Sequence, residues 1–358
     1  MADIIGSHNM ELTLNSSIGY FVILFTISLL LVPINIKLSN KYKLLDQPTE
    51  HSIHKTVRPL CGGFSIALPI IAILFYHHLI IRPGTDFPNL LMLIIGSIAI
   101  LIAGFFDDKY HLSAWWKLLF QIIIAIFMFW SGFRITLLTN PWNDALSLGL
   151  LSFPATVLWF LLLINSFNLI DGIDGLASGI SVIVSAVLIL IGYNFHNPLL
   201  FYLSLFLFAT NLAFLFYNFP PAKIFLGDTG SQFIGFYIAA ISIAGNAQYK
   251  GITAMTLLIP ILILFIPLAD TFLAILRRIK YKKGIFTRDQ HHLHHKMLRL
   301  GLAPRTINYI CYFVTLLFGL IAIGFSFTDK NLLFTILIFL AIVFFVVLYL
   351  IVKKELLK

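Results

Sequence analysis

Charged residues are scarce in this chain. Only 11% of its 358 residues are Asp, Glu, Lys or Arg, whereas about a quarter of the residues in soluble domains are charged. Hydrophobic residues make up 59%, which is more apolar surface than a water-soluble fold of this length can bury. The composition therefore excludes a soluble protein and predicts one embedded in a membrane.

Cysteine is almost absent as well. Cys61 and Cys311 are far apart and form no CxxC pair, which excludes a disulfide scaffold and a cysteine metal site. Both are predicted to be small buried hydrophobes. The sequence also lacks internal repeats, low-complexity tracts and an evident cleavable signal peptide, because the first apolar run is long enough to span a membrane. Residues 1–9, with Gly6-Ser7-His8, resemble a cloning remnant, and no role is predicted for them.

Apolar runs of about 20 residues recur along the chain, the length that crosses about 30 Å of hydrocarbon as a helix. We expect an all-α integral membrane protein with about eleven transmembrane helices, in which residues 1–358 form a single polytopic domain. The expected spans are about 17–36, 62–81, 88–106, 115–135, 150–165, 176–193, 197–217, 231–246, 252–275, 308–327 and 332–352.

The basic residues orient these spans. Of the 24 Lys and Arg residues, all but Arg82, Arg134, Lys250 and Lys330 fall on one face. By the positive-inside rule that face is cytoplasmic, so the N-terminus lies outside and the C-terminus in the cytoplasm. Residues 276–307 then form a long cytoplasmic loop. The net charge of +9 is accordingly an orientation signal, and no nucleic-acid partner is expected.

Two adjacent carboxylates, Asp107 and Asp108, end the third expected span. Such a pair at a membrane edge is costly to desolvate unless a cation or a basic side chain neutralises it. Taken alone, the pair is compatible with a solvated loop start or with a cation site.

A polar segment, residues 165–175, joins the fifth and sixth spans. Asn165 and Asn168 are three residues apart, as are Asp171 and Asp174, so each pair would share one face of a helix. Two glycines in the segment allow tight turns and close approach of a ligand. A plain linker does not need these residues, and the segment is predicted to be functional.

A glycine-rich turn, Gly227-Asp228-Thr229-Gly230-Ser231, opens the eighth span. Backbone N–H groups at a helix N-terminus can bind a phosphate while Asp228 holds its cation. The same residues also suit an ordinary turn with a helix cap, and both interpretations stay open.

Four histidines lie within residues 288–296 of the long loop. Their spacing matches neither HExxH nor a zinc finger, and their basic surroundings favour anion or substrate binding over zinc.

Asp270, near the cytoplasmic end of the ninth span, is a further candidate, because an ionisable group inside a span is often functional. Pairing with a nearby arginine is the alternative.

These clusters gather on one membrane face. Carboxylate oxygens prefer Mg²⁺, and Mg²⁺ together with basic side chains is the usual equipment for binding a pyrophosphate. A polytopic setting implies a lipid substrate. The sequence therefore favours phosphoryl transfer involving a lipid phosphate.

At this level of detail the chain resembles the polyprenyl-phosphate N-acetylhexosamine-1-phosphate transferases of glycosyltransferase family 4. The resemblance runs from about residue 46 to residue 301. It rests, in chain order, on Asp46-Gln47-Pro48, His54, Arg58-Pro59-Leu60-Cys61-Gly62-Gly63, Asp107-Asp108, Lys117, Gln121, Asn165 to Gly175, Asn218, Pro221-Ala222-Lys223, Gly227 to Ser231, Asp289 and His292-Leu293-His294-His295.

The resemblance implies a reaction and its partners. An amino-sugar-1-phosphate, most directly GlcNAc-1-phosphate, would pass from a UDP-sugar to undecaprenyl phosphate, giving a lipid-linked pyrophosphoryl sugar and UMP. This would be the first membrane step of a cell-envelope glycan such as lipopolysaccharide or teichoic acid. It implies Mg²⁺, with Mn²⁺ as a substitute, and the cytoplasmic face of a bacterial inner membrane. A homodimer is a further possible assembly. The His-x-His-His pattern resembles the UDP-GlcNAc branch, and a phospho-N-acetylmuramoyl-pentapeptide transferase is the alternative.

The resemblance and the site chemistry together imply residue roles. The catalytic candidates are Asp107, Asp108 and Asp171, and the metal candidates are Asp228 and Asp171. The substrate-binding candidates are Lys117, Asn165, Asn168, Asn218, Arg288, His292, His294 and His295. In two places the chain departs from its relatives: His51-Ser52-Ile53 replaces a frequent Arg-Lys before His54, and His111 replaces an Asp found in some relatives.

The competing class is a transporter of an anionic solute, which would share the helix count and the basic face. Transporters usually place polar sites near the bilayer midplane, often within paired repeats. Here the polar motifs lie at predicted helix ends and no repeat is present, which favours the enzyme.

Overall fold

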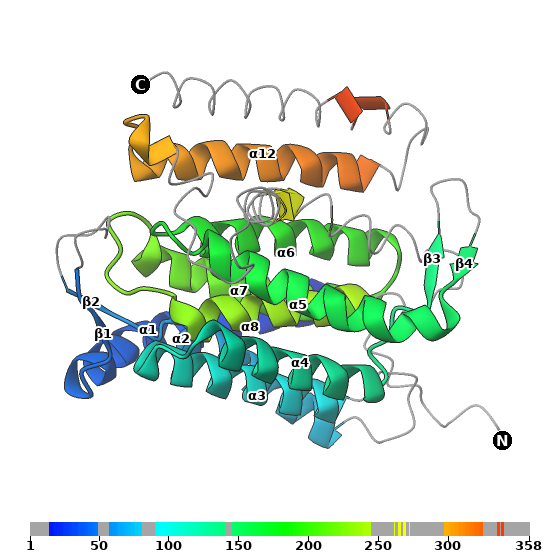
Figure 1. Ribbon diagram of the computed structural model, residues 1–358, viewed down its shortest axis with the longest axis horizontal. Helices are drawn as coiled ribbons and strands as arrows, with labels where there is room; N and C mark the ends of the chain where they lie inside the picture. The colour runs from blue at the N-terminus through cyan, green and yellow to red at the C-terminus, as the bar shows by residue number, and fades with distance from the viewer. Residues whose placement is uncertain are drawn as a thin grey trace.

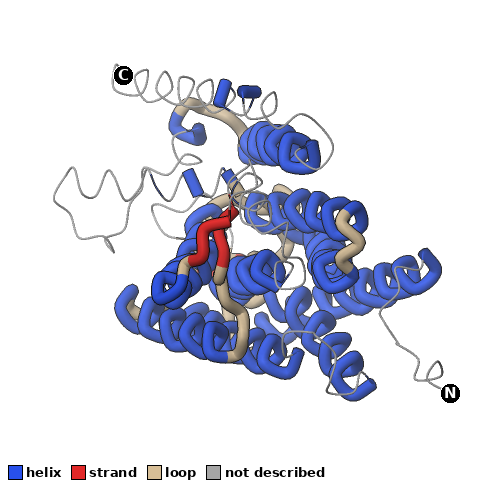
Figure 2. The backbone as a smooth tube through the Cα atoms, turned by 90° about the vertical axis from the view of Figure 1, so that its right-hand side faces the viewer, coloured by secondary structure: helices blue, strands red, loops and turns tan. Residues whose placement is uncertain are grey.

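Long helices lying side by side make up the computed structural model (Figure 1), and the end-on view shows them as a bundle (Figure 2). The structure describes residues 14–48, 57–80, 90–139, 145–244 and 297–324, with isolated positions within 261–272 and 335–339. The described helices are α1 (Leu14–Lys41), α2 (Gly63–Ile80), α3 (Leu90–Tyr110), α4 (Ala114–Trp130), α5 (Ser152–Ile170), α6 (Leu176–Asn194), α7 (Pro198–Asn218), α8 (Gly227–Ala244) and α12 (Pro304–Gly324), with a short 3₁₀ helix, η1 (Gly149–Leu151), before α5.

The membrane class expected from the composition is confirmed. Six of these helices are long and apolar enough to cross a membrane, and α2 and α4 are shorter apolar helices. Large hydrophobic side chains are exposed on the outer faces, among them Leu30, Leu79 and Phe216, as expected for surfaces that contact lipid. The expected spans 252–275 and 332–352 fall largely outside the described residues. The count of eleven and the orientation therefore stay predictions.

Two small antiparallel hairpins mark opposite ends of the bundle (Figure 1). Strands β1 (Leu45–Asp46) and β2 (Arg58–Pro59) pair where α1 ends and α2 begins, and β3 (Leu137–Thr139) and β4 (Ala145–Ser147) pair between α4 and α5. The polar motifs lie at the β1–β2 end, because α3 and α5 end there and α4 and α8 begin there.

Helix α8 is the most enclosed element, since every residue from Thr229 to Ala244 is buried. It packs against α2, α3, α5 and α7. Glycines permit the closest approaches: a Cβ on Gly104 of α3 would lie 2.6 Å from the Asp228 carbonyl oxygen, and one on Gly235 would lie 2.5 Å from that of Leu163. Small residues at such crossings let membrane helices pack backbone to backbone. The start of α8 is thereby fixed against its neighbours.

Two helices continue further than the apolar runs predict. Helix α3 extends to Tyr110 rather than about 106, and α5 extends to Ile170 rather than about 165. The added turns are polar, but their side chains find hydrogen-bond partners on neighbouring helices, so they can stay helical at the bundle end. Asp107, Asp108, Asn165 and Asn168 are consequently held on helices rather than on loops.

Candidate active site

Four helix ends bring most of the polar motifs together. The last turns of α3 and α5 carry Asp107, Asp108 and Asn168, the first turn of α4 carries Lys117, and the first turn of α8 carries Asp228. These five side chains come from segments up to about 120 residues apart in sequence and are joined by direct hydrogen bonds or ion pairs. We call them the helix-end cluster.

Asp108 closes the N-terminus of α8. Its Oδ1 accepts the backbone N–H of Asp228 at 2.7 Å, and its Oδ2 accepts the N–H of Thr229 at 3.0 Å and the Thr229 hydroxyl at 2.5 Å. The first N–H groups of a helix lack intrahelical partners, and a carboxylate there satisfies them and complements the helix dipole. The structure therefore gives Asp108 a positioning contact with the turn that carries Asp228.

Lys117 joins the two other carboxylates of the cluster. Its ammonium nitrogen lies 2.6 Å from Oδ2 of Asp107 and 3.1 Å from Oδ2 of Asp228. Asp107 is nearly closed to solvent, whereas the side chains of Lys117 and Asp228 keep 23% and 25% of their exposure. The open side of the cluster thus presents a cation and a carboxylate to an incoming ligand.

Asn168 fixes the remaining oxygen of Asp228. Its amide nitrogen donates to Oδ1 of Asp228 and also, at 3.0 Å, to the hydroxyl of Ser231. Both oxygens of Asp228 therefore have a donor, one neutral and one charged. This arrangement fixes the direction of the carboxylate before any ligand binds.

A series of hydrogen-bonded side-chain amides supports Asp107 on its buried side. Asn165 on α5 donates to Gln121 on α4 at 2.8 Å, Gln121 donates to Gln232 on α8 at 3.3 Å, and Gln232 donates to Oδ2 of Asp107 at 3.1 Å. Both glutamines are 1% exposed. We call this series of hydrogen-bonded side chains the amide relay. Asn165 belongs to the amide relay and does not lie at the open side of the cluster.

Gln232 was missing from the residues expected from sequence. It lies one residue beyond the Gly227–Ser231 motif and four residues after Asp228. Residues four apart share a helix face, so this spacing could have identified it.

Asp171 follows the last residue of α5. Its removal from water, and then its repulsion by Asp228, Asp108 and Asp174, hold the pKa of this carboxyl well above its ordinary value. In the described part of the chain no group donates a hydrogen bond to it. A nearby cation would favour the ionised form of this carboxyl. Asp171 is therefore suited to bind a metal ion or a basic ligand.

Asn218 lies at the end of α7 and holds the loop after Asp171. Its carbonyl oxygen accepts the N–H of Gly175 at 3.0 Å and the Ser178 hydroxyl at 2.8 Å, while its amide donates to the Ile224 carbonyl at 2.9 Å. Gly175 has a φ of +77°, a conformation that favours glycine. Asn218 therefore links residues 171–178 to the segment leading into α8, and its contacts are structural.

Helix α12 holds the same loop from the other side. Asn308 donates to the Asp174 carbonyl at 2.7 Å, Arg305 donates to the Pro220 carbonyl at 2.9 Å, and Tyr312 donates to the Gly175 carbonyl. The carboxylate of Asp174 accepts the N–H of Ala222 at 2.9 Å. The carboxylate of Asp174 thus has a structural hydrogen bond, whereas no described group donates one to Asp171.

No preformed metal centre exists among the residues that the structure describes, where no three His, Cys, Asp or Glu side chains are close enough to hold an ion. The oxygen donors of Asp228 and Asp171 nevertheless fit Mg²⁺, which proteins often bind through one or two carboxylates and substrate phosphates. A site of that kind is completed only by its substrate.

Several expected residues lie outside the described part of the chain. These are Arg288, His292, His294 and His295, together with Asp270, His51 and His54. His111 is described; it is exposed and has a φ of +50°.

Comparison with known proteins gives concordant matches. A family model described as glycosyl transferase family 4 matches residues 90–246, which contain every residue of the helix-end cluster. A probable undecaprenyl-phosphate N-acetylglucosaminyl 1-phosphate transferase of Bacillus subtilis is 36% identical over 307 residues, covering 86% of this chain and 84% of that protein.

Two further relatives extend the comparison. A decaprenyl-phosphate N-acetylglucosaminephosphotransferase of Mycobacterium leprae is 30% identical over 315 residues, covering 80% of this chain and 77% of that protein. A phospho-N-acetylmuramoyl-pentapeptide-transferase of Clostridium perfringens is 29% identical over 320 residues, covering 84% of this chain and 94% of that protein.

Proposed function

Since the chain belongs to glycosyl transferase family 4, we propose that it transfers GlcNAc-1-phosphate from UDP-GlcNAc to undecaprenyl phosphate. The products are a lipid-linked pyrophosphoryl GlcNAc and UMP. The relative at 36% identity is named for this reaction, while the muramoyl-pentapeptide transferase compared above is 29% identical. The single structural observation that carries the proposal is Lys117 held between Asp107 and Asp228 at the partly open helix-end cluster.

The chemistry requires no external base. An oxygen of the lipid phosphate attacks the β-phosphorus of the UDP-sugar, a new P–O bond forms, and the bond to the bridging oxygen breaks to release UMP. A phosphate monoester has a second pKa near 6, so at neutral pH it is already largely a dianion, and charge balances without a proton transfer. Positioning and charge neutralisation are therefore the main tasks of the side chains.

The described side chains divide these tasks. Lys117 offers its ammonium to the lipid phosphate, and Asp107 and the amide relay fix where that ammonium lies. Asp108 holds the first turn of α8 so that Asp228 faces the pyrophosphate. Asn168 orients Asp228 through its second oxygen. In this scheme Asp107 and Asp108 position reacting groups and do not remove a proton.

Mg²⁺ is part of the proposal. Asp228 and Asp171 would hold it together with phosphate oxygens of the substrate, and it would supply neutralisation of the charge on the pyrophosphate. Asp171, whose raised pKa reflects burial among other carboxylates, would be ionised more readily beside the ion. We assign Arg288, His292, His294 and His295 to phosphate and sugar binding.

The protein crosses the membrane several times. We further propose the bacterial inner membrane, with the helix-end cluster facing the cytoplasm. The asymmetric distribution of Lys and Arg supports this orientation.

A donor panel tests the proposal. Purified protein with undecaprenyl phosphate and Mg²⁺ is offered radiolabelled UDP-GlcNAc, UDP-GalNAc or UDP-MurNAc-pentapeptide, each with and without EDTA. We expect a lipid-linked product from UDP-GlcNAc alone, and its loss with EDTA. Product from UDP-MurNAc-pentapeptide alone would overturn the donor assignment, and EDTA-insensitive transfer would overturn the role of Mg²⁺.

A further inference from the structure

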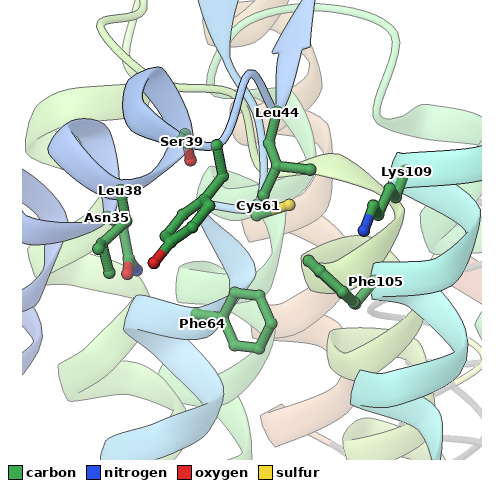
Figure 3. A pocket seen from close by; sticks show the side chains of 9 residues that line it. Asn35, Leu38, Ser39, Leu44, Cys61, Phe64, Phe105 and Lys109 are labelled. Atoms are coloured by element: carbon green, nitrogen blue, oxygen red, sulfur yellow. The ribbon is translucent and has the colours of Figure 1, made fainter.

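A cavity lies beside the helix-end cluster, at the same end of the bundle. It measures about 380 Å³ and is enclosed by α1, α2, α3 and the segment around β1 and β2 (Figure 3). Its size falls within the about 300–1,000 Å³ of typical small-molecule sites. The lining residues are Asn35, Leu38, Ser39, Tyr42, Leu44, Cys61, Phe64, Phe105 and Lys109. None of them belongs to the helix-end cluster, so the space is separate from the proposed transfer site.

Cys61 forms the wall between the two sites. It lines the cavity, and its thiol donates to Oδ2 of Asp108 at a sulfur–oxygen distance of 3.7 Å. The other contacts of Asp108 are to the first turn of α8. A molecule in the cavity would therefore touch the support of Asp108 without reaching Lys117 or Asp228.

The lining combines apolar walls with one cation. Leu38, Leu44, Phe64 and Phe105 supply the walls, and Lys109 lies one helical turn after Phe105 on the same face of α3. Figure 3 shows its amino nitrogen directed toward the cavity. Apolar walls beside a single ammonium group suit a molecule that has an apolar chain and a negative head.

Among the described residues, none forms an ion pair with Lys109, so its ammonium can meet the negative head of such a molecule. Its carboxylate neighbours in sequence, Asp107 and Asp108, are bound to Lys117 and to the start of α8 on the other side of the helix. Within the described ranges Lys109 has no ion pair, and its ammonium lies 5.1 Å from the centre of the Tyr110 ring. One N–H of the Asn35 amide donates to Ser65 at 2.6 Å and the Ser39 hydroxyl donates to the Leu60 carbonyl at 2.8 Å, so Lys109 supplies the charged donor of the lining.

The surface around the cavity is that of a membrane interface. Leu38, Tyr42 and Phe106 are 44%, 63% and 45% exposed, and the exposed Lys37 and Lys41 lie on the last turns of α1. Aromatic and basic side chains at the end of a membrane helix are characteristic of the headgroup level. Membrane lipid is therefore the molecule that this cavity meets first.

We propose that the cavity binds an anionic membrane phospholipid, with its phosphate at Lys109 and part of an acyl chain against Leu38, Phe64 and Phe105. Bound lipid stabilises the wall that carries Cys61 and hence the position of Asp108. This site goes beyond the proposed function, and its occupancy is measured without any transfer reaction.

Native mass spectrometry of the full chain in detergent, titrated with phosphatidylglycerol or phosphatidylcholine, tests the proposal. We expect preferential retention of phosphatidylglycerol. Lys109→Gln lowers that affinity about fivefold, as expected for loss of one direct contact between an ammonium group and the lipid phosphate, and Lys109→Arg restores it. Leu44→Trp, which fills the cavity, removes the bound lipid. Lys37→Gln makes the same change of charge on α1 outside the cavity and leaves lipid retention unchanged.

Equal retention of both lipids, or equal loss in Lys109→Gln and Lys37→Gln, would overturn the proposal. Displacement of phosphatidylglycerol by equimolar undecaprenyl phosphate in the wild type, but not in Lys109→Gln, would assign the cavity to the acceptor and also overturn it. If Leu44→Trp does not fold, the comparison of the lysine variants still decides the outcome.

Discussion

Lys117 joins a buried carboxylate of the cluster, Asp107, to a partly exposed one, Asp228. Its ammonium contacts Asp107 at 2.6 Å and Asp228 at 3.1 Å, so one side chain sets the spacing between a buried and a partly exposed carboxylate. The two carboxylates share its single positive charge, and its side chain stays 23% exposed. A phosphate that reaches the cluster therefore meets a cation that is already in place, which reduces the entropy lost on binding.

Gln232 is predicted to position Asp107. Gln232→Leu removes the donor to Asp107 and the partner of Gln121, so we expect kcat to fall about tenfold to a hundredfold because Asp107 and Lys117 shift. Thermal stability also falls, since buried polar groups lose their partners. Steady-state kinetics together with thermal unfolding measure both effects.

Trp159→Phe is the matched control for this variant. It removes another buried bond to α8, from the Trp159 indole to Ser242 at 2.9 Å, on a part of the helix remote from the cluster. It is expected to lower stability and leave kcat unchanged. An equal loss of kcat in both variants would reduce Gln232 to a purely structural role.

Cys61 is predicted to resist thiol reagents. Burial, and then the charge of Asp108, raise the pKa of its thiol to about 12. Because a raised thiol pKa favours the neutral form, Cys61 carries almost no thiolate at pH 8, and the thiolate is the reactive species. Maleimide at pH 8 should label Tyr42→Cys, at an exposed position, much faster than the wild-type chain. Rapid labelling of the wild type at Cys61 would contradict the buried contact with Asp108.

At the scale of elements, the site depends on helix ends rather than on loops. The motifs were located from sequence, since glycines, asparagines and carboxylates interrupt apolar runs at Asp107, Asn165 and Asp228. The separate roles of the two asparagines could not be predicted from sequence, because Asn165 and Asn168 have the same side chain and differ only in the groups that neighbouring helices place beside them. Asn165 faces Gln121, whereas Asn168 faces Asp228.

The loop after α5 is predicted to depend on Asn218. Asn218→Ala removes three buried hydrogen bonds to Gly175, Ser178 and Ile224, and each unsatisfied group costs about 1–3 kcal/mol. We expect a lower melting temperature and faster amide hydrogen exchange in residues 171–178. Transfer falls as well, because Asp171 precedes this loop.

Asn197→Ala provides the comparison. Asn197 caps α7 at its other end by accepting the Leu200 N–H at 3.0 Å, and loss of such a cap costs about 1 kcal/mol. Its exchange pattern around residues 171–178 should match the wild type. Increased exchange there in Asn197→Ala, or none in Asn218→Ala, would show that the loop is not held by Asn218.

At the scale of the whole molecule, the sequence predicts the class and the end of the bundle that carries the site. Runs of apolar residues and the scarcity of charge required a polytopic helical protein, and the structure confirms it. The central position of α8 was not predictable, because its burial arises from contacts with α2, α3 and α5, which are distant in sequence, as well as with α7. Gly104 and Gly235, which permit those contacts, carry no distinguishing pattern in sequence.

The orientation of the bundle is predicted to place the helix-end cluster on the cytoplasmic side. His111→Cys, in the exposed turn between α3 and α4, should react with an impermeant maleimide only in inside-out vesicles. Leu150→Cys, at a position 96% exposed at the other end, should react only in right-side-out vesicles. Both native cysteines are buried and give little background. The reverse pattern would place the cluster outside the cell.

Transfer by Asp228→Asn, measured in the wild-type lipid environment with UDP-GlcNAc, undecaprenyl phosphate and a Mg²⁺ titration, tests the central claim most directly. The change keeps the shape of the side chain but removes the charge that binds Lys117 and, in our proposal, Mg²⁺. We predict a loss of kcat of about a thousandfold or more, in a protein that folds normally by size-exclusion chromatography. Wild-type turnover with an unchanged Mg²⁺ requirement would contradict the assignment of the helix-end cluster as the site of transfer.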